Sequence, residues 1–180
     1  MDNMLVWIGV AALAVIVLAF NFLVGRKNQV ETAFSSIDVQ LKKRYELIPN
    51  LVAVCEKYMG YEQKVLADLT ATRTRILAAD DETRVALDGA LSSQLKSVFA
   101  VAENYPELAA AETFTLLQRS LNEVEEQLAA ARRFFNSAVN DYNNAVEMFP
   151  TNVLARLLGY RRRNWFEAAA DEREAVKVWR

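Results

Sequence analysis

The sequence predicts an all-α protein with one N-terminal transmembrane helix and a cytoplasmic antiparallel bundle of two long and two shorter helices. Three observations lead to this fold class. Residues 4–25 are apolar apart from Asn21. Beyond residue 26, apolar side chains recur at spacings of three and four, the period of helices that pack on other helices. Strand-like alternation bounded by turn residues is found nowhere in the sequence.

The apolar block MLVWIGVAALAVIVLAFNFLVG is long enough to span a membrane, because about 20 apolar residues cross the hydrocarbon core. Trp7 lies near its outer end, where indole rings favour the headgroup layer. A cleaved signal peptide is the alternative, but it would need a basic residue before the block, where only Asp2 stands. We expect a retained span over 4–25, preceded by a short N-terminus of residues 1–3.

The charges that flank the block predict its orientation. Arg26 and Lys27 follow it directly, and positive flanks stay on the cytoplasmic side. We therefore expect a single-pass protein of the inner membrane, with its N-terminus outside and residues 26–180 in the cytoplasm. Trp7, Arg26 and Lys27 are the predicted interface residues of the span.

Four helices are predicted within the bundle region 26–149, over residues 28–59, 61–79, 83–103 and 108–149. Short loops make successive helices antiparallel, so the last long helix should return its end, near Phe149, to the bilayer. The segment that follows, 150–167, mixes apolar and basic residues, which is typical of an interfacial segment on an anionic leaflet. Its predicted interface residues are Arg156, Arg161, Arg162, Arg163, Trp165 and Phe166. Alternatively, its apolar residues cap the bundle and its arginines are solvated; the tail 168–180 is a short helix or a mobile end.

The stretch IDVQLKKRYELIPNLV, residues 37–52, places Pro49 inside a helical pattern. The apolar repeat keeps its phase through the proline, with Leu41, Tyr45 and Ile48 before it and Val52 and Cys55 after it. We therefore predict a kink at Pro49 within one helix. The carbonyl of Tyr45 then lacks its intrahelical donor, and the side chain of Asn50 or Arg44, or water, is expected to satisfy it.

The composition excludes several kinds of active site. The chain has no histidine, one cysteine, five scattered glycines and a net charge of −2, so we expect no catalytic residue, metal, cofactor or nucleic-acid partner. Cys55 is expected to be a small core residue. The charged residues of the first bundle helix are expected to form a solvated, salt-bridged face: Asp38, Lys42, Lys43, Arg44 and Glu46. A carboxylate hydrolase that pairs Asp38 or Glu46 with Asp141 or Glu147 is the least supported alternative.

The last long helix carries a polar row whose members share one face: Asn136, Asn140, Asn143, Asn144 and Glu147. Asparagine is a mediocre helix former, so the row suggests hydrogen bonds between helices or between subunits; a solvated face is the alternative. Phe134 lies beside the apolar seam. Apolar surface that two short helices leave uncovered would be buried by a second copy of the chain.

Three segments, IDVQLKKRYELIPNLV, RRFFNSAVNDYNNAVEMFPTNVLA and GYRRRNWFE, resemble the LemA family of bacterial membrane proteins, and the N-terminal anchor is typical of it. The resemblance implies a single N-terminal span, an outside N-terminus and a cytoplasmic bundle of long antiparallel helices; it implies no established reaction. The function we expect is that of a non-enzymatic, homo-oligomeric scaffold at the membrane surface, whose partners are the lipid bilayer and other copies of itself. The alternative is an adaptor that binds a membrane protease or an envelope-stress or signalling protein.

Overall fold

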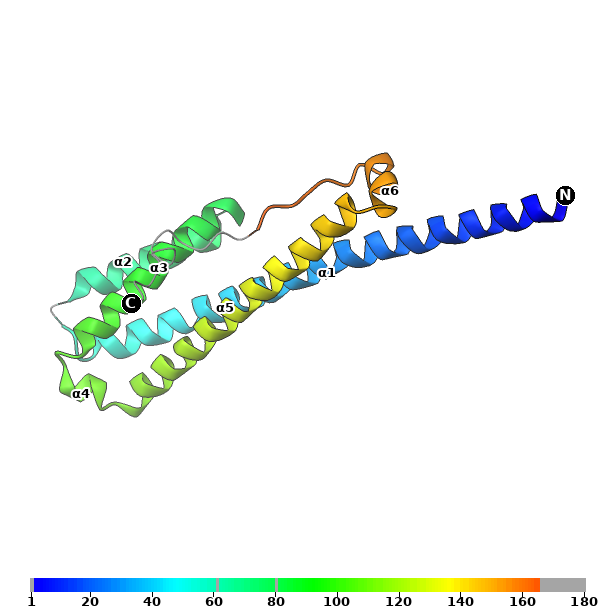
Figure 1. The fold of residues 1–180 in the computed structure, drawn as a ribbon. Coiled ribbons are helices and arrows are strands. Elements are labelled where there is room, and N and C mark those ends of the chain that lie inside the picture. Colours follow the sequence, from blue (N-terminus) through cyan, green and yellow to red (C-terminus); the bar gives the residue numbers. More distant parts are fainter. Residues whose placement is uncertain (1, 61, 80, 166–180) are drawn as a thin grey trace, which may run out of the picture. The chain divides into compact units, whose positions relative to one another are not determined.

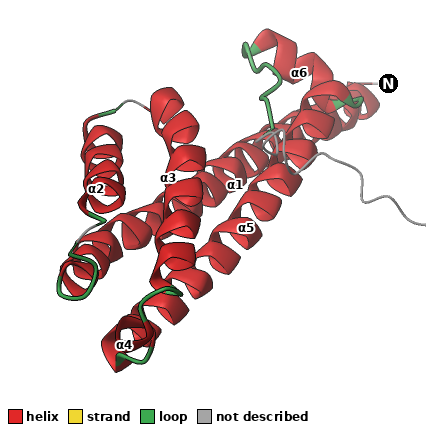
Figure 2. Cartoon of the chain, turned by 90° about the vertical axis from the view of Figure 1, so that its left-hand side faces the viewer, coloured by secondary structure: helices red, strands yellow, loops and turns green. Residues whose placement is uncertain are grey.

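A computed structural model describes residues 2–60, 62–79 and 81–165, and every element in this part of the chain is a helix (Figure 1). The view in Figure 2 likewise contains helices and loops but no strand among the described residues. The predicted all-α class is therefore confirmed. Phe166 and the predicted tail 168–180 lie outside the described residues.

The six helices in chain order are α1 (Asp2–Glu56), α2 (Gln63–Ala78), α3 (Asp81–Ala102), α4 (Pro106–Ala109), α5 (Glu112–Glu147) and α6 (Thr151–Leu157). The predicted span and the first predicted bundle helix are thus one uninterrupted helix, α1. The predicted helix over 108–149 differs at its start, because Pro106 opens the separate short helix α4. Proline suits the first position of a helix, where its missing N–H would have no intrahelical partner.

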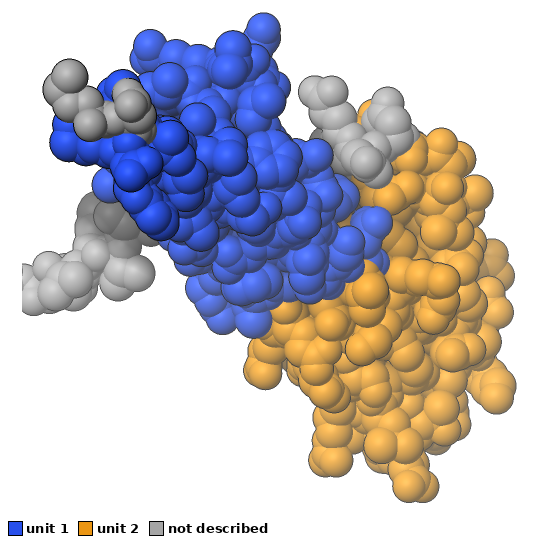
Figure 3. All heavy atoms as spheres, turned by 90° about the vertical axis from the view of Figure 1, so that its right-hand side faces the viewer, with its two compact units in different colours: residues 1–38, 129–168 blue, residues 39–128, 169–180 orange. Residues whose placement is uncertain are grey.

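By its packing the chain divides into two compact units (Figure 3). Of the described residues, unit 1 contains 2–38 and 129–165, and unit 2 contains those within 39–128. Helices α1 and α5 each contribute to both units.

Unit 1 is built on the antiparallel pairing of α1 with the second half of α5. The partner in α5 moves toward the N-terminus as the chain advances along α1. Leu23 packs with Ala145, Arg26 contacts Asp141, and the rings of Phe34 and Phe135 lie 6.0 Å apart. Residues 3–18 of α1 are exposed throughout, whereas Ala19, Leu23 and Val30 are buried. The described part of α1 therefore contains one apolar segment long enough to cross a membrane, and most of this segment is exposed.

Unit 2 packs α2 on α3 and brings aromatic side chains of α3 and α5 together. The rings of Phe99 and Phe114 meet edge to face at 6.0 Å. Cys55 is fully buried at the end of α1, as its place in the apolar stripe predicts, and burial raises the pKa of its thiol to about 11. A thiol with such a pKa is inert at neutral pH, because the thiolate is the reactive form.

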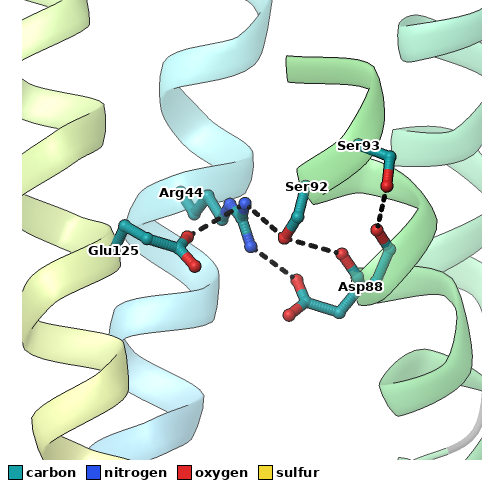
Figure 4. Close-up of polar contacts among 6 residues, drawn as sticks. Arg44, Asp88, Ser92, Ser93 and Glu125 are labelled. Atoms are coloured by element: carbon teal, nitrogen blue, oxygen red, sulfur yellow. Dashed lines mark hydrogen bonds and ion pairs between the residues drawn. The ribbon is translucent and has the colours of Figure 1, made fainter. Parts of the chain in front are cut away.

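Arg44 of α1 is the buried cation of unit 2 (Figure 4). Its guanidinium donates to Asp88 Oδ1 at 3.1 Å and to Ser92 Oγ at 2.8 Å, both on α3, and lies 3.0 Å from Glu125 Oε2 on α5. Asp88 is 2% exposed. Loss of one partner from such a pair leaves an uncompensated buried charge, which costs about 3–5 kcal/mol. The expectation that Arg44 lies on a solvated face is therefore wrong: the side chain is enclosed because three helices converge on it.

Helix α1 passes through Pro49 without a break, as the phase of the apolar repeat predicts. The carbonyl of Tyr45, which Pro49 leaves without a donor, accepts a hydrogen bond of 2.8 Å from Nε of Arg73 on α2. The expected donors, Asn50 and Arg44, were the wrong ones. Arg44 is engaged with Asp88 and Ser92, so a neighbouring helix supplies the missing donor.

Replacement of Arg73 by methionine should lower the free energy of unfolding by about 1.5–3 kcal/mol, because a buried carbonyl loses a charged donor. In a Pro49→Ala background the loss should shrink, since the amide of residue 49 can then donate to Tyr45. Thermal and denaturant unfolding of the full-length protein in mild detergent, followed by circular dichroism, gives the free energy of unfolding of the wild type, the two single variants and the double variant. Arg75→Met, an exposed change on the same helix, is the control. If Arg73→Met lowered the free energy of unfolding equally in the wild-type and Pro49→Ala backgrounds, the proposed role of Arg73 as the donor to the Tyr45 carbonyl would be contradicted.

Candidate membrane-interface site

The chain turns sharply where α5 ends, and the hydroxyl of Thr151 stabilises the turn by hydrogen bonds to backbone carbonyls. Oγ1 of Thr151 donates to the carbonyl of Ala145 in the last turn of α5, at 2.6 Å, and to that of Met148, at 2.9 Å. The Met148 carbonyl also accepts from the N–H of Asn152, at 2.9 Å. Helix α6 then packs Ala155, fully buried, against Leu23 of α1 and Ala145 of α5. The small alanine side chains allow the three backbones to approach closely. The corner formed by residues 148–158, which we call the α5–α6 corner, thus sits against the last turns of the apolar segment.

The outer side of the α5–α6 corner is apolar. Phe149 and Leu157 are 82% and 80% exposed. The complete set of exposed large apolar side chains in the corner is Met148, Phe149, Val153, Leu157 and Leu158. Isolated exposed apolar residues are ordinary, but a contiguous group usually marks a surface that another apolar phase covers.

After α6 the chain runs back along α5, and Asn143 holds it there. The side chain of Asn143, 3% exposed, donates through Nδ2 to the carbonyl of Arg163 at 3.0 Å and accepts from the N–H of Arg163 at 2.9 Å. The hydroxyl of Tyr142 donates to the carbonyl of Arg161 at 2.9 Å. The guanidinium of Arg163 lies over the Tyr142 ring, 5.5 Å from its centre. Burial raises the pKa of Tyr142, and the positive charge of Arg163 partly opposes this shift.

Two hollows lie beside residues 20–27 of α1. The larger, about 570 Å³, is lined by Phe20, Lys27, Tyr142 and residues 158–163; we call it the basic hollow. The smaller, about 300 Å³, is lined on α1 by Phe22 and Arg26. Arg26 donates to Gln29 at 3.0 Å, pairs with Asp141 at 3.1 Å and lies over the ring of Phe22.

The structure brings most of the predicted interface residues together at one end of unit 1. Lys27 and Arg161, Arg162 and Arg163 line the basic hollow, and Arg26 lines the smaller one. Arg156 is exposed on α6, Trp165 is 50% exposed, and Trp7 is 72% exposed far along the apolar segment.

The five residues of the predicted polar row on α5 lie in different surroundings. Asn143 points inward and is used within the chain, Glu147 pairs with Arg162 at 3.2 Å, and Asn136 is half-buried. Asn140 and Asn144 are exposed, and Phe134 is 47% exposed. The burial of Asn143 could be inferred from the sequence, because Asn143 follows Tyr142 of the apolar seam and lies on the same side of α5 as Val139.

The two α5 carboxylates named for a hydrolase are both engaged by arginine, Asp141 by Arg26 and Glu147 by Arg162. In the described part of the chain, no group of three or more His, Cys, Asp or Glu side chains could hold a metal ion.

Comparison with known proteins agrees with the sequence resemblance. A profile of the LemA family matches residues 33–179. The chain belongs to the LemA family. Among curated relatives of this LemA family protein is Magnetosome protein MamQ 2 of Paramagnetospirillum magneticum, 23% identical over 88% of this chain and 68% of the relative. Magnetosome protein MamQ of Magnetospirillum gryphiswaldense is 21% identical over 87% and 68%. Protein LemA of Metamycoplasma hominis is 24% identical over 87% and 72%.

Asn143→Ala should release the returning segment while α5 stays folded. Loss of both hydrogen bonds to Arg163 should raise tryptic cleavage after residues 161–163 by roughly tenfold, because cleavage tracks local opening. Limited proteolysis of the full-length protein with mass mapping measures this. The adjacent exposed Asn144→Ala is the matched control, and equal cleavage of the two variants would contradict the role of Asn143.

Proposed function

We propose that this LemA family protein is a non-enzymatic, single-pass membrane protein whose folded region is a homo-oligomeric scaffold on the cytoplasmic surface of the bilayer. The observation that carries the membrane part is the α5–α6 corner beside an apolar helix segment that is exposed over residues 3–18. The corner lies beside the end of this segment, because its buried Ala155 packs with Leu23.

Helix dimensions support a position of the corner in the bilayer interface. Residues 3–18 extend about 24 Å at 1.5 Å per residue. The hydrocarbon core is about 30 Å thick, so the bare part of α1 falls about 6 Å short. The next turn of α1, up to Leu23, lies where the corner packs. Placing Phe149, Val153 and Leu157 at the edge of the hydrocarbon core covers their exposed apolar surface with lipid and completes the span.

The cytoplasmic orientation rests on charge. Arg26, Lys27, Arg156 and residues 161–163 all lie at the same end of the apolar segment. An excess of positive charge next to a span is retained on the cytoplasmic side.

Self-association is supported by the exposed face of α5 in unit 1. Asn140 and Asn144, four residues apart, share a face of α5 and are both exposed, and Phe134, on a neighbouring face, is 47% exposed. The occupant we propose for this face is a second copy of the chain. Copies anchored in one membrane share an orientation and a high effective concentration, so even a small interface can hold them together.

The depth of the α5–α6 corner is directly measurable. A fluorophore attached through Leu157→Cys should be quenched by spin-labelled lipids in nanodiscs, because Leu157 is placed at the hydrocarbon edge. The matched control is Leu77→Cys on α2, which is also an exposed leucine, 56% against 80%. Cys55 is buried, so the introduced cysteine is the reactive thiol. Equal weak quenching at both positions would contradict the interfacial placement.

Self-association is tested by disulfide cross-linking in native membranes. Asn140→Cys or Asn144→Cys should give cross-linked dimers, whereas Lys96→Cys on the exposed side of α3 should not. Native mass measurement in mild detergent then gives the subunit number. A strictly monomeric mass with no cross-link at either α5 position would refute the scaffold.

The adaptor for a membrane protease or signalling protein remains the second candidate. It predicts a stoichiometric foreign partner after mild solubilisation, and in that case the cross-links from α5 lead to that partner instead of to a second copy.

A further inference from the structure

The basic hollow carries more positive than negative charge. Four cations line it: Lys27, Arg161, Arg162 and Arg163. The carboxylates that pair with them in the described chain are Glu31, at 3.7 Å from Lys27 and 3.6 Å from Arg163, and Glu147, at 3.2 Å from Arg162. Four positive charges against two leave an excess of two. Each of these pairs is solvent-exposed on at least one side and therefore worth little, so an incoming anion can compete for the cations.

The smaller hollow on the other side of α1 lacks this excess. Arg26 there is matched by Asp141 at 3.1 Å and also donates to Gln29. The two hollows lie along the same stretch of α1, residues 20–27, yet the charges are balanced in one and not in the other. Attraction for anions is therefore a property of the basic hollow and not of the whole end of unit 1.

The apolar part of the basic hollow indicates what kind of anion fits. Phe20 belongs to the apolar segment of α1, and Lys27 is seven residues further along. Seven residues are two turns, so the two side chains share a face and lie roughly 10 Å apart along the axis. The hollow thus begins in the apolar segment and ends among arginines. Its volume of about 570 Å³ is ordinary for a small-molecule site.

We propose that the basic hollow binds the phosphate of an anionic phospholipid, with the headgroup phosphate on the guanidinium groups of residues 161–163 and the glycerol end of the acyl chains against Phe20. Arginine suits this role, because its planar fork of donors matches phosphate oxygens in bidentate fashion. The hydrogen bonds of Asn143 and Tyr142 to the backbone of residues 161 and 163 hold the arginines in place without using their side chains. The site rests on the membrane location that the proposed function also uses, and is independent of self-association.

Native mass spectrometry of the full-length protein in mild detergent tests the site, with phosphatidylglycerol, phosphatidylcholine and inorganic phosphate as the probes. Wild type should retain phosphatidylglycerol and not phosphatidylcholine. Arg161→Gln should weaken retention about tenfold, the effect of one charged hydrogen bond. Arg156→Gln removes the same charge from an exposed arginine outside the hollow and should change retention less than about twofold, as expected for a screened surface charge.

Several outcomes would overturn the proposal. Equal losses in the two arginine variants would show diffuse attraction instead of a site. Equal retention of phosphatidylcholine would show that charge does not select the lipid. Binding of inorganic phosphate as tight as that of phosphatidylglycerol would overturn the lipid as the source of the phosphate. The same spectra report subunit number, so a lipid-bound monomer would contradict only the scaffold, and a lipid-free oligomer would contradict only this site.

Discussion

The guanidinium of Arg44 has to be paired wherever unit 2 is folded, and its partners come from different helices. Asp88 and Ser92 approach from α3, and Glu125 from α5. The next residue, Tyr45, offers the carbonyl that Arg73 of α2 binds. Two consecutive residues of α1 therefore contact three other helices. Because a buried charge tolerates few alternative pairings, this arrangement selects one rotational setting of each helix, which apolar packing alone specifies less sharply.

The bond from Arg73 also has a consequence for α1. Pro49 removes a backbone donor, and an unsatisfied carbonyl at Tyr45 would favour a break in the helix. With that carbonyl satisfied by α2, α1 continues to Glu56, and the helix with the bare apolar segment also contributes to unit 2. The apolar segment and the α1 residues of unit 2 therefore belong to one continuous helix.

In unit 1, the candidate site depends on a polar residue in a packed position. Asn143 satisfies both backbone groups of Arg163, and this returns the chain after α6 to the side of α5. The convergence of the arginines of residues 161–163 with Lys27 creates the local excess of positive charge, although the whole chain carries a net charge of −2. Local placement, and not composition, concentrates positive charge at this surface.

The sequence by itself determined the helical class, the apolar segment, the continuity of the helix through Pro49 and the core place of Cys55, because each follows from local spacing along one helix. Arg44 and Asp88 carried a detectable signal, since both fall in the phase of the buried stripe, Asp88 three residues before Leu91. Their pairing was decided only by the tertiary structure, as were the bond from Arg73 to Tyr45, the clamp by Asn143 and the basic hollow. Each of these joins residues far apart in the sequence, and the periodicity of one helix holds no information about which side chain of another helix will reach it.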